Sequence, residues 1–355
     1  HSLTEIAPAE WDAVVGAELT MSHRWLHVVE QTWQHCQSLY VLFRDGEEAI
    51  AVAVANRETP FHRASKTGSL LTRCMFFVTP PFSSTGCGVL TRPGVELAEV
   101  LPQVVPILEH IMWHERRPLL VISNLPGKDL PVWQTQAFAP SAQPCLSILD
   151  LPASYADYLQ TLDKKDRAEL RRIRRRAAEQ QVTFQQGPLN GDGEAIYPLL
   201  RTVFEQHTTP IPFTPAFFTR LEQVMPGEVI LFKGFVGGQL AGVSFCLRHE
   251  QILWWPMVGL DYAMARPTYL YFLLIDEMVQ WSIQQGIWRI YGGTTAEQEK
   301  RKHGFYQQER WIGYHAQPAV LNHVIKFALP LAQRYLKASN PTLTLPKGRG
   351  LIREI

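Results

Sequence analysis

The sequence repeats one pattern of β-forming runs in its two halves. In the first half, two apolar runs within residues 40–54 flank a short polar stretch that contains Gly46. In the second half, two similar runs within residues 229–245 flank Gly237 and Gly238. β-Branched and aromatic runs on either side of a glycine turn are typical of a β-hairpin. A pattern repeated at domain-sized spacing therefore indicates two copies of one structural unit.

The repeat continues with a helix and then a strand in each half. Apolar residues at helical spacing between residues 95 and 116 precede the apolar run 119–122. In the second half, a helix expected over residues 269–285 precedes the run 288–291. The pattern of each half thus predicts a hairpin, a further strand, a helix and a strand, in that order. We expect an α/β (α+β) fold of two tandem domains, each a mixed central sheet flanked by helices.

The helix expected in the second half carries its own boundary signals. Pro267 precedes it, and Thr268 is a candidate N-cap. Gly286 follows it and suits the left-handed residue that commonly ends a helix.

The expected domain boundary lies near Asp150, where the chain reaches a proline at position 152. We predict a structural N-terminal domain over residues 1–150 and a catalytic C-terminal domain over residues 151–338. The remaining residues, 339–355, are basic and rich in proline and glycine, so we expect a loosely held tail.

Composition argues against several classes of protein. The net charge of +1 leaves no global attraction for nucleic acid, so a double-stranded DNA partner is not expected. The five cysteines include no CxxC pair, which is typical of a reducing, cytoplasmic compartment. The N-terminus has no charged head followed by an apolar run, so we expect no signal peptide. No run of about 18 apolar residues is present that would span a membrane. Neither metal-ligand spacing nor a nucleotide-binding glycine motif is present, so no metal and no tightly bound cofactor are expected.

Three segments resemble the Fem-like class of the GNAT superfamily. They are residues 162–175, 210–218 and 286–304. In the last segment, Gly292 and Gly293 end a strand, and Lys300 and Gly304 follow in Lys-x-x-x-Gly spacing. The resemblance extends over residues 150–315. It implies transfer of an acyl group to an acceptor, usually an amine, from aminoacyl-tRNA, acyl-CoA or an acyl carrier protein.

Four side chains of the second half are candidate catalytic groups. Lys300 is suited to stabilise an oxyanion or a phosphate, and a solvated charge run over residues 297–302 is the alternative. Tyr269 is suited to protonate a leaving group or to pack in the core. Asp261 is suited to act as a base, although a turn cap is the commoner role of such a residue. His207, which lies close to Glu205, is suited to deprotonate an ammonium group or to stabilise a helix end.

The donor site is expected beside the strand 254–259. Pro256 interrupts its ladder of hydrogen bonds, which favours either a functional bulge or an edge distortion. Simple GNAT enzymes hold the pyrophosphate of coenzyme A in a glycine-rich loop, but the corresponding stretch here, 263–268, has no glycine. Side chains and a helix dipole remain to hold a phosphate. The candidate donor-binding residues are Arg266, Thr268, Gly292, Gly293 and Thr294.

The helix expected over residues 155–180 has the densest charge in the chain. Its basic residues at spacings of three and four predict one cationic face. That face consists of Lys164, Arg167, Arg171, Arg174 and Arg175. A solvated surface is the ordinary explanation of such a run. An anionic partner is the alternative, and a tRNA, an acidic acyl carrier protein or an anionic lipid surface would each fit.

These observations support three hypotheses on function. The first is an N-acyltransferase that moves an acyl group from an acyl carrier protein or acyl-CoA thioester to a small-molecule or lipid amine, with at most peripheral membrane contact. The second is a Fem-type transferase that forms a peptide bond from aminoacyl-tRNA, favoured by the missing glycine loop and the basic helix. The third is a non-catalytic binding protein on the same scaffold.

Overall fold

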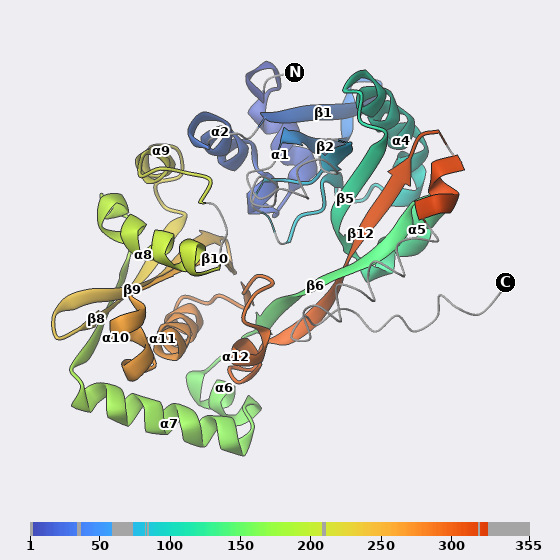
Figure 1. The fold of residues 1–355 in the computed structure, drawn as a ribbon. Helices are drawn as coiled ribbons and strands as arrows, with labels where there is room; N and C mark the ends of the chain where they lie inside the picture. Colours follow the sequence, from blue (N-terminus) through green and yellow to red (C-terminus); the bar gives the residue numbers. More distant parts are fainter. Residues whose placement is uncertain are drawn as a thin grey trace. The chain divides into compact units, whose positions relative to one another are not determined.

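The computed structural model divides the chain into two compact units (Figure 1). The described residues are 3–33, 37–58, 74–81, 83, 85–207, 211–318 and 320–325. Unit 1 comprises residues 1–30, 35–146 and 308–355, and unit 2 comprises residues 31–34 and 147–307. The chain passes between them inside strands β6 (Ala139–Asp150) and β12 (Tyr306–Ala316). The assignment of a structural half to residues 1–150 and a catalytic half to residues 151–338 stays a prediction, and the tail 339–355 lies outside the described residues.

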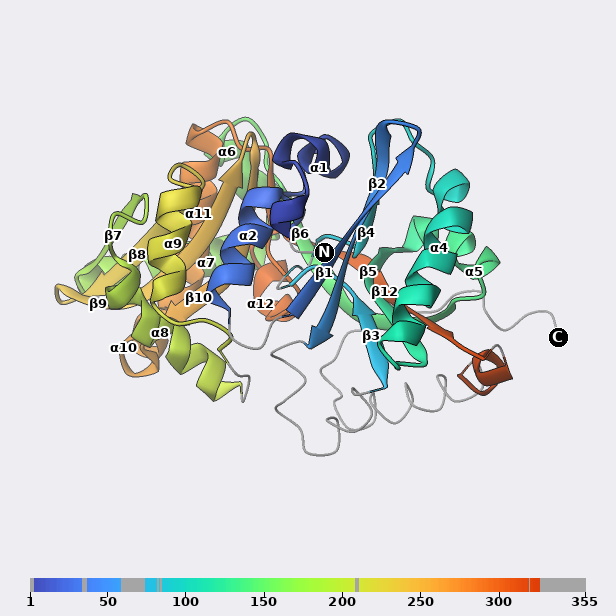
Figure 2. The ribbon, with the colours of Figure 1, turned by 90° about the horizontal axis from the view of Figure 1, so that it is seen from above.

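Unit 1 is a mixed sheet with the strand order β1-β2-β3-β5-β12, to which β4 adds by pairing with β2. Its strands are β1 (Gln37–Asp45), β2 (Glu48–Glu58), β3 (Met75–Val78), β4 (Val89–Thr91) and β5 (Leu119–Pro126). Its helices are α1 (Pro8–Val15), α2 (His23–Thr32, whose last two residues fall in unit 2), α4 (Leu97–His114) and α5 (Leu130–Thr135). The predicted hairpin is β1–β2, and α4 packs its apolar face on the sheet (Figure 2).

Unit 2 is a second mixed sheet, with the order β6-β11-β10-β9-β8-β7. Its further strands are β7 (Val182–Gly187), β8 (Val229–Val236), β9 (Gln239–His249), β10 (Ile252–Leu260) and β11 (Arg289–Tyr291). Its helices are α6 (Tyr155–Thr161), α7 (Lys164–Glu179), α8 (Gly193–Gln206), α9 (Ala216–Val224), α10 (Tyr262–Thr268), α11 (Leu270–Gln284) and α12 (Glu297–Arg301). Both units are thus mixed sheets flanked by helices, and the predicted fold class is confirmed.

The hairpin β8–β9 turns on Gly237 and Gly238, both with positive φ, as the sequence predicts. Helix α11 packs against these strands and β10, and its first residue, Leu270, lies directly over them. A Cβ at Gly234 or Gly242 would lie 2.7 or 2.8 Å from the Leu270 side chain. The two glycines therefore allow the helix to approach the sheet closely.

The start of α11 differs from the prediction. Pro267 and Thr268 belong to a separate short helix, α10, and Tyr269 divides it from α11 with a φ of 56°. The Thr268 hydroxyl donates to the carbonyl oxygens of Met264 and Ala265, at 2.8 and 3.2 Å. The N-cap prediction for Thr268 was wrong because this hydroxyl bonds back into α10. The predicted stop at Gly286 is confirmed by its φ of 69°.

Candidate active site

The candidate site lies where two parallel strands of unit 2 stop pairing. Strands β10 and β11 pair over three residues, and the last pair is Trp254 with Tyr291. Beyond it, β10 continues to Leu260, whereas the main chain after β11 bonds to β6. The Gly292 amide donates to the Ser147 carbonyl oxygen at 2.8 Å. The Ser147 amide donates in turn to the Gly293 carbonyl oxygen at 2.9 Å. The carboxyl ends of such strands are where open α/β sheets bind ligands.

A bulge in β10 lies at the same point. Trp254 pairs with Leu247 of β9 and Met257 pairs with Phe245, so Trp255 and Pro256 together stand opposite one residue. Pro256 has no amide hydrogen to donate to the ladder, which is why the register shifts here. The predicted interruption of the strand is confirmed as a bulge.

Lys300, on α12, lies at this point. Only 3% of its surface is exposed. Its Nζ donates to the carbonyl oxygens of Gly292 and Thr295, the latter at 2.6 Å, and lies 5.0 Å from the ring centroid of Trp255. Burial lowers the pKa of Lys300 to about 7, against the opposing attraction of the Glu299 carboxylate. Lys300 is therefore a buried amine that gains or loses its proton near neutral pH.

The predicted glycines shape the turn around this amine. A Cβ at Gly292 would lie 2.8 Å from the Phe305 ring, and Gly293 has a φ of 73°. Thr294 follows and is partly exposed. The structure thus brings Lys300, Gly292 and Gly293 together, as the sequence predicted, with Thr294 beside them in the chain.

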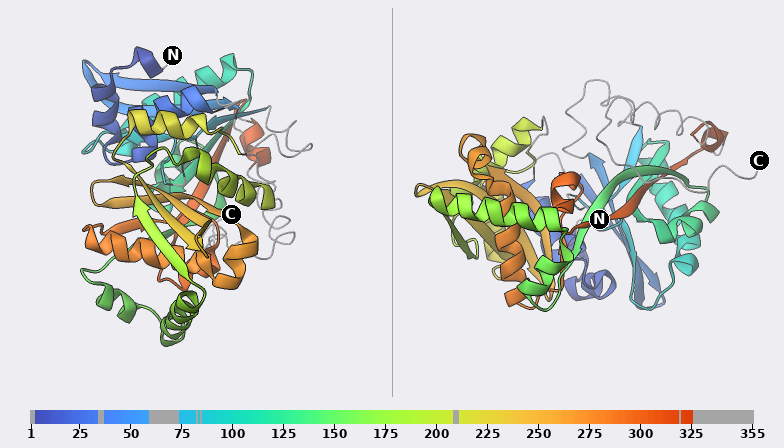
Figure 3. Two further views of the ribbon diagram at one scale, coloured as in Figure 1. Left: turned by 90° about the vertical axis from the view of Figure 1, so that its left-hand side faces the viewer. Right: turned by 90° about the horizontal axis from the view of Figure 1, so that it is seen from below.

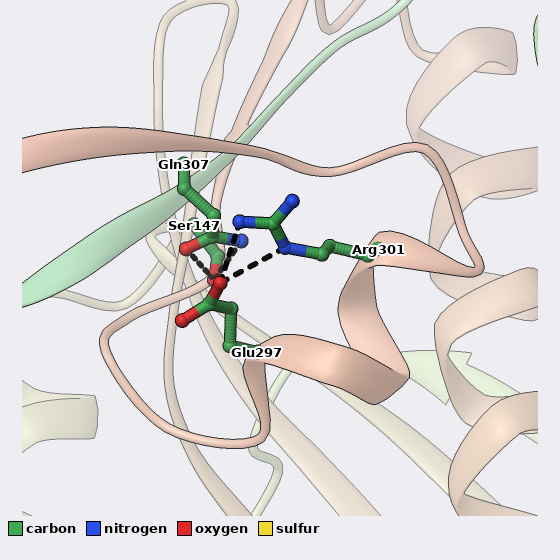
Figure 4. A network of polar contacts seen from close by, with 4 residues as sticks. All are labelled: Ser147, Glu297, Arg301 and Gln307. Carbon is green, nitrogen blue, oxygen red and sulfur yellow. Dashed lines mark hydrogen bonds and ion pairs between the residues drawn. The ribbon is translucent and has the colours of Figure 1, made fainter. Parts of the chain in front are cut away.

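Figure 4 shows two polar contacts close to Lys300, one within α12 and one between β6 and β12. Arg301 forms an ion pair with Glu297, one turn earlier on α12, at 2.6 Å. The side chains of Ser147 on β6 and Gln307 on β12 are hydrogen-bonded at 3.1 to 3.2 Å. The first contact lies within α12, and the second involves Ser147, whose carbonyl oxygen accepts from the Gly292 amide.

Two residues beside Lys300 were not among the predicted site residues. Trp255 contacts Lys300 and packs against Tyr271, with 5.8 Å between ring centroids. His303 stacks on Phe272 at 5.7 Å and is 4% exposed. Burial lowers the pKa of His303 to about 4, so its imidazole is neutral at pH 7. The position of His303 inside the Lys-x-x-x-Gly element was the one available sequence signal.

The remaining predicted catalytic residues have local partners of their own. Asp261 caps α10, since its Oδ1 accepts from the amides of Ala263 and Met264 at 2.9 and 3.2 Å. This is the capping alternative weighed for Asp261. His207 is exposed immediately after the last residue of α8. The proposed catalytic roles of both residues stay predictions.

Tyr269 is oriented toward α7. Its ring lies under two guanidinium groups, those of Arg172 at 5.2 Å and Arg176 at 5.6 Å. A hydrogen bond from Arg172 lowers the pKa of Tyr269. The adjacent donor-site candidate Arg266 lies 5.0 Å from the ring of Tyr262, on its own helix.

The predicted cationic face of α7 is divided by the packing of the helix, which lies on the outer side of unit 2 (Figure 3). Arg174 forms an ion pair with buried Asp276 of α11, and Arg167 donates to the Leu159 carbonyl oxygen at 3.0 Å. Both side chains therefore serve the fold. The exposed basic side chains of the helix are Lys164, Lys165, Arg171, Arg172, Arg175 and Arg176.

Over the described part of the chain, no cluster of three or more His, Cys, Asp or Glu residues is arranged to hold a metal ion. Within the same residues, no helix is long and apolar enough to cross a membrane. The predicted compartment stays a prediction.

Comparison with known proteins gives a family match and several similar folds. A sequence model of the FemAB-like family, described as peptidoglycan biosynthesis and recognition, matches residues 150–344. No curated protein matches the chain. The crystal structure of FemX is similar with a TM-score of 0.59 and 10% identity, over 90% of this chain and 98% of that chain.

Two further solved structures have the same fold. One is the C-terminal domain of a putative lysylphosphatidylglycerol synthetase from Agrobacterium fabrum, with a TM-score of 0.54 and 11% identity over 93% of this chain and 98% of that chain. The other is L-PGS from Bacillus licheniformis, with a TM-score of 0.52 and 11% identity over 87% of this chain and 94% of that chain.

Proposed function

The chain belongs to the FemAB-like family, and on that premise we propose that it transfers an acyl or aminoacyl group to an amine, with Lys300 at the reaction centre. The observation that carries the proposal is the buried Lys300 amine, held by two carbonyl oxygens at the point where β10 and β11 separate. Two of its three N–H donors are used there, so the ammonium form has one left for a substrate.

The chemistry follows from that donor. When a neutral amine attacks the carbonyl carbon, a C–N bond forms and the carbonyl electron pair moves to oxygen. An ammonium N–H at a buried site stabilises this oxyanion more strongly than it would in water. The C–O or C–S bond to the carrier then breaks as the oxyanion collapses, and the leaving oxygen or sulfur takes the proton that the attacking nitrogen releases.

The donor that we propose is an aminoacyl ester of tRNA. Coenzyme A sites in simple GNAT enzymes need free backbone amides in a glycine-rich loop. Here the amides of Ala263 and Met264 bond to Asp261, and the Tyr269 amide donates to the Arg266 carbonyl oxygen at 3.3 Å. The exposed basic side chains of α7 are complementary to a polyanion.

The acceptor that we propose is a primary amine of a peptidoglycan precursor peptide, following the description of the family. One structural neighbour is the C-terminal domain of a putative lysylphosphatidylglycerol synthetase. Phosphatidylglycerol therefore belongs in the acceptor panel as the alternative to an amine: its nucleophile is a hydroxyl group, and its product would be an ester. An acyl thioester on a carrier protein remains the second candidate donor, because α7 also suits an acidic protein surface.

The test is product formation followed by mass spectrometry. Wild-type protein is incubated with aminoacyl-tRNA, acyl carrier protein thioesters or acyl-CoA, each with the acceptor panel. We expect an amide product from aminoacyl-tRNA. Lys300→Met should lose it while exposed Lys302→Met retains it. If only thioesters are consumed, the donor is an acyl thioester and not aminoacyl-tRNA. If no donor gives a product, the result favours a non-catalytic binding protein.

Salt dependence separates the two donor classes further. If the exposed basic residues of α7 hold tRNA, the logarithm of the binding constant should fall linearly with the logarithm of salt concentration. Exchanging Arg171 and Arg175 for Gln should reduce that slope by about one for each phosphate that these side chains neutralise. Arg201, which is exposed on α8, provides the control. Tight tRNA binding that is indifferent to salt would contradict this arrangement.

A further inference from the structure

Trp255 has a buried hydrogen-bond donor without an acceptor. The residue is 5% exposed, and its Nε1 has no hydrogen-bond partner in the part of the chain that the structure describes. Leaving a buried donor unpaired costs about 1–3 kcal/mol. A ligand that supplies the missing acceptor is one explanation of such a group. The indole nitrogens of Trp254 and Trp311 also have no partner among the described residues, and the contact with Lys300 is what distinguishes Trp255.

Trp255 and the preceding residue, Trp254, have different surroundings on β10. Strand residues alternate between the two faces of a sheet, and Trp254 and Trp255 follow that rule. Trp254 packs against Tyr291 with 5.6 Å between ring centroids, whereas Trp255 packs in the core with residues of α11 and contacts Lys300. Two residues in contact therefore each have an N–H donor available, one on an indole and one on an ammonium group.

The spacing of the two groups suits one shared acceptor. An oxygen that accepts from both needs donors no more than about 6 Å apart, because each hydrogen bond is about 2.9 Å long. Nζ of Lys300 lies 5.0 Å from the centroid of the ring that carries Nε1, so the two donors belong to groups in direct contact. The surrounding ionisable groups are Glu299 and His303 on the α12 side and Tyr271 on α11.

We propose that the Trp255 Nε1–H and the remaining N–H of Lys300 together bind the carbonyl oxygen of the acyl donor and the oxyanion that forms from it. The proposal rests on the proposed function and assigns Trp255 as a second catalytic residue of the same site. The indole keeps its proton throughout: it donates a hydrogen bond as charge gathers on the oxygen, and releases that oxygen when the C–O bond to the carrier breaks.

The first test removes the N–H and keeps the ring. Incorporating 3-benzothienylalanine at position 255 replaces the indole N–H by sulfur in a side chain of nearly the same shape. We expect kcat to fall by roughly 100-fold to 1,000-fold, as for loss of one oxyanion donor. KM should stay near the wild-type value, and the thermal midpoint should not fall, because the analogue removes a buried donor that has no partner in the free protein. The same replacement of Trp281, which packs on Phe232, is the control and should change neither constant.

The outcomes distinguish the proposed role of Trp255 from the proposed amide-forming activity. If the position-255 analogue keeps full kcat while Lys300→Met is inactive, amide transfer stands and the role of Trp255 is overturned. If both lose activity while the Trp281 analogue does not, the two-donor site is supported. Trp255→Phe provides a second variant that keeps an aromatic face toward Lys300 and also lacks the donor.

A binding measurement does not depend on knowing the donor. In protein labelled with ¹⁵N-tryptophan, the Trp255 indole resonance is identified by its loss in Trp255→Phe. We expect titration with methylphosphonate, a small tetrahedral oxyanion, to shift this resonance and leave that of Trp281 in place. The shift should disappear in Lys300→Met. A Trp255 resonance that does not respond to the oxyanion in wild-type protein would overturn the proposal.

Discussion

Replacing Lys300 by Met is expected to change how the stability of the protein depends on pH. The folded state lowers the pKa of Lys300 from 10.5 to about 7, because the amine is buried. Between these values the unfolded chain holds a proton that the folded chain has released. Raising the pH through this window therefore stabilises the folded wild type, and lowering it toward 7 removes that contribution.

The magnitude follows from the width of the window. One pKa unit corresponds to about 1.4 kcal/mol, so two pH units inside it, from about pH 7.5 to 9.5, change the unfolding free energy by roughly 3 kcal/mol. Met has nearly the same length and no charge. It also leaves the carbonyl oxygens of Gly292 and Thr295 without their donor, but that cost is the same at every pH. The change of the stability difference with pH therefore reports on the Lys300 amine alone.

The assay is urea unfolding at both pH values, followed by tryptophan fluorescence. The stability of the wild type minus that of Lys300→Met should rise by roughly 3 kcal/mol from the lower to the higher pH. Lys302→Met, which removes an exposed lysine two residues along, should keep the wild-type dependence. A difference that stays constant across the range would refute the argument that burial lowers the pKa of Lys300.

Three further perturbations test the structure around the site. His303, with its pKa lowered from 6.5 to about 4, should destabilise the fold by roughly 3 kcal/mol as pH falls through that range. His303→Phe should lose this dependence in urea unfolding. Gly292→Ala should lower the unfolding free energy by about 1–3 kcal/mol, because its Cβ would lie 2.8 Å from the Phe305 ring. Gly187→Ala, which has open space around its Cβ, is the control and should lower stability less in thermal unfolding. Asp261→Ala should lower the unfolding free energy by about 1 kcal/mol, because α10 loses its N-cap. Asp261→Asn should keep the cap. An amide-formation assay of Asp261→Asn then tests the proposed base: activity should be retained if Asp261 only caps the helix and lost if it is the base.

Much of the fold follows from local sequence signals. Gly237 and Gly238 specify the β8–β9 turn, because few other residues adopt two successive positive φ angles at low cost. Gly286 ends α11 for the same reason, and Pro256 disturbs β10 because it has no amide hydrogen. The Lys-x-x-x-Gly element also identified Lys300. Each of these inferences needed only the chemistry of a few neighbouring residues.

Packing decided what those signals left open. Nothing local marks Tyr269 as the left-handed break between α10 and α11, where its ring meets two arginines of α7. The spacing of basic residues on α7 did not predict that Arg174 would pair with a carboxylate on another helix. The contact of Trp255 with Lys300 likewise joins residues far apart in the chain. Side-chain burial, pairing and proton affinity depend on surroundings that only the folded chain supplies. The sequence by itself therefore determined most helices and strands and identified Lys300 as a candidate. The tertiary structure decided which side chains surround Lys300 and how readily it holds its proton.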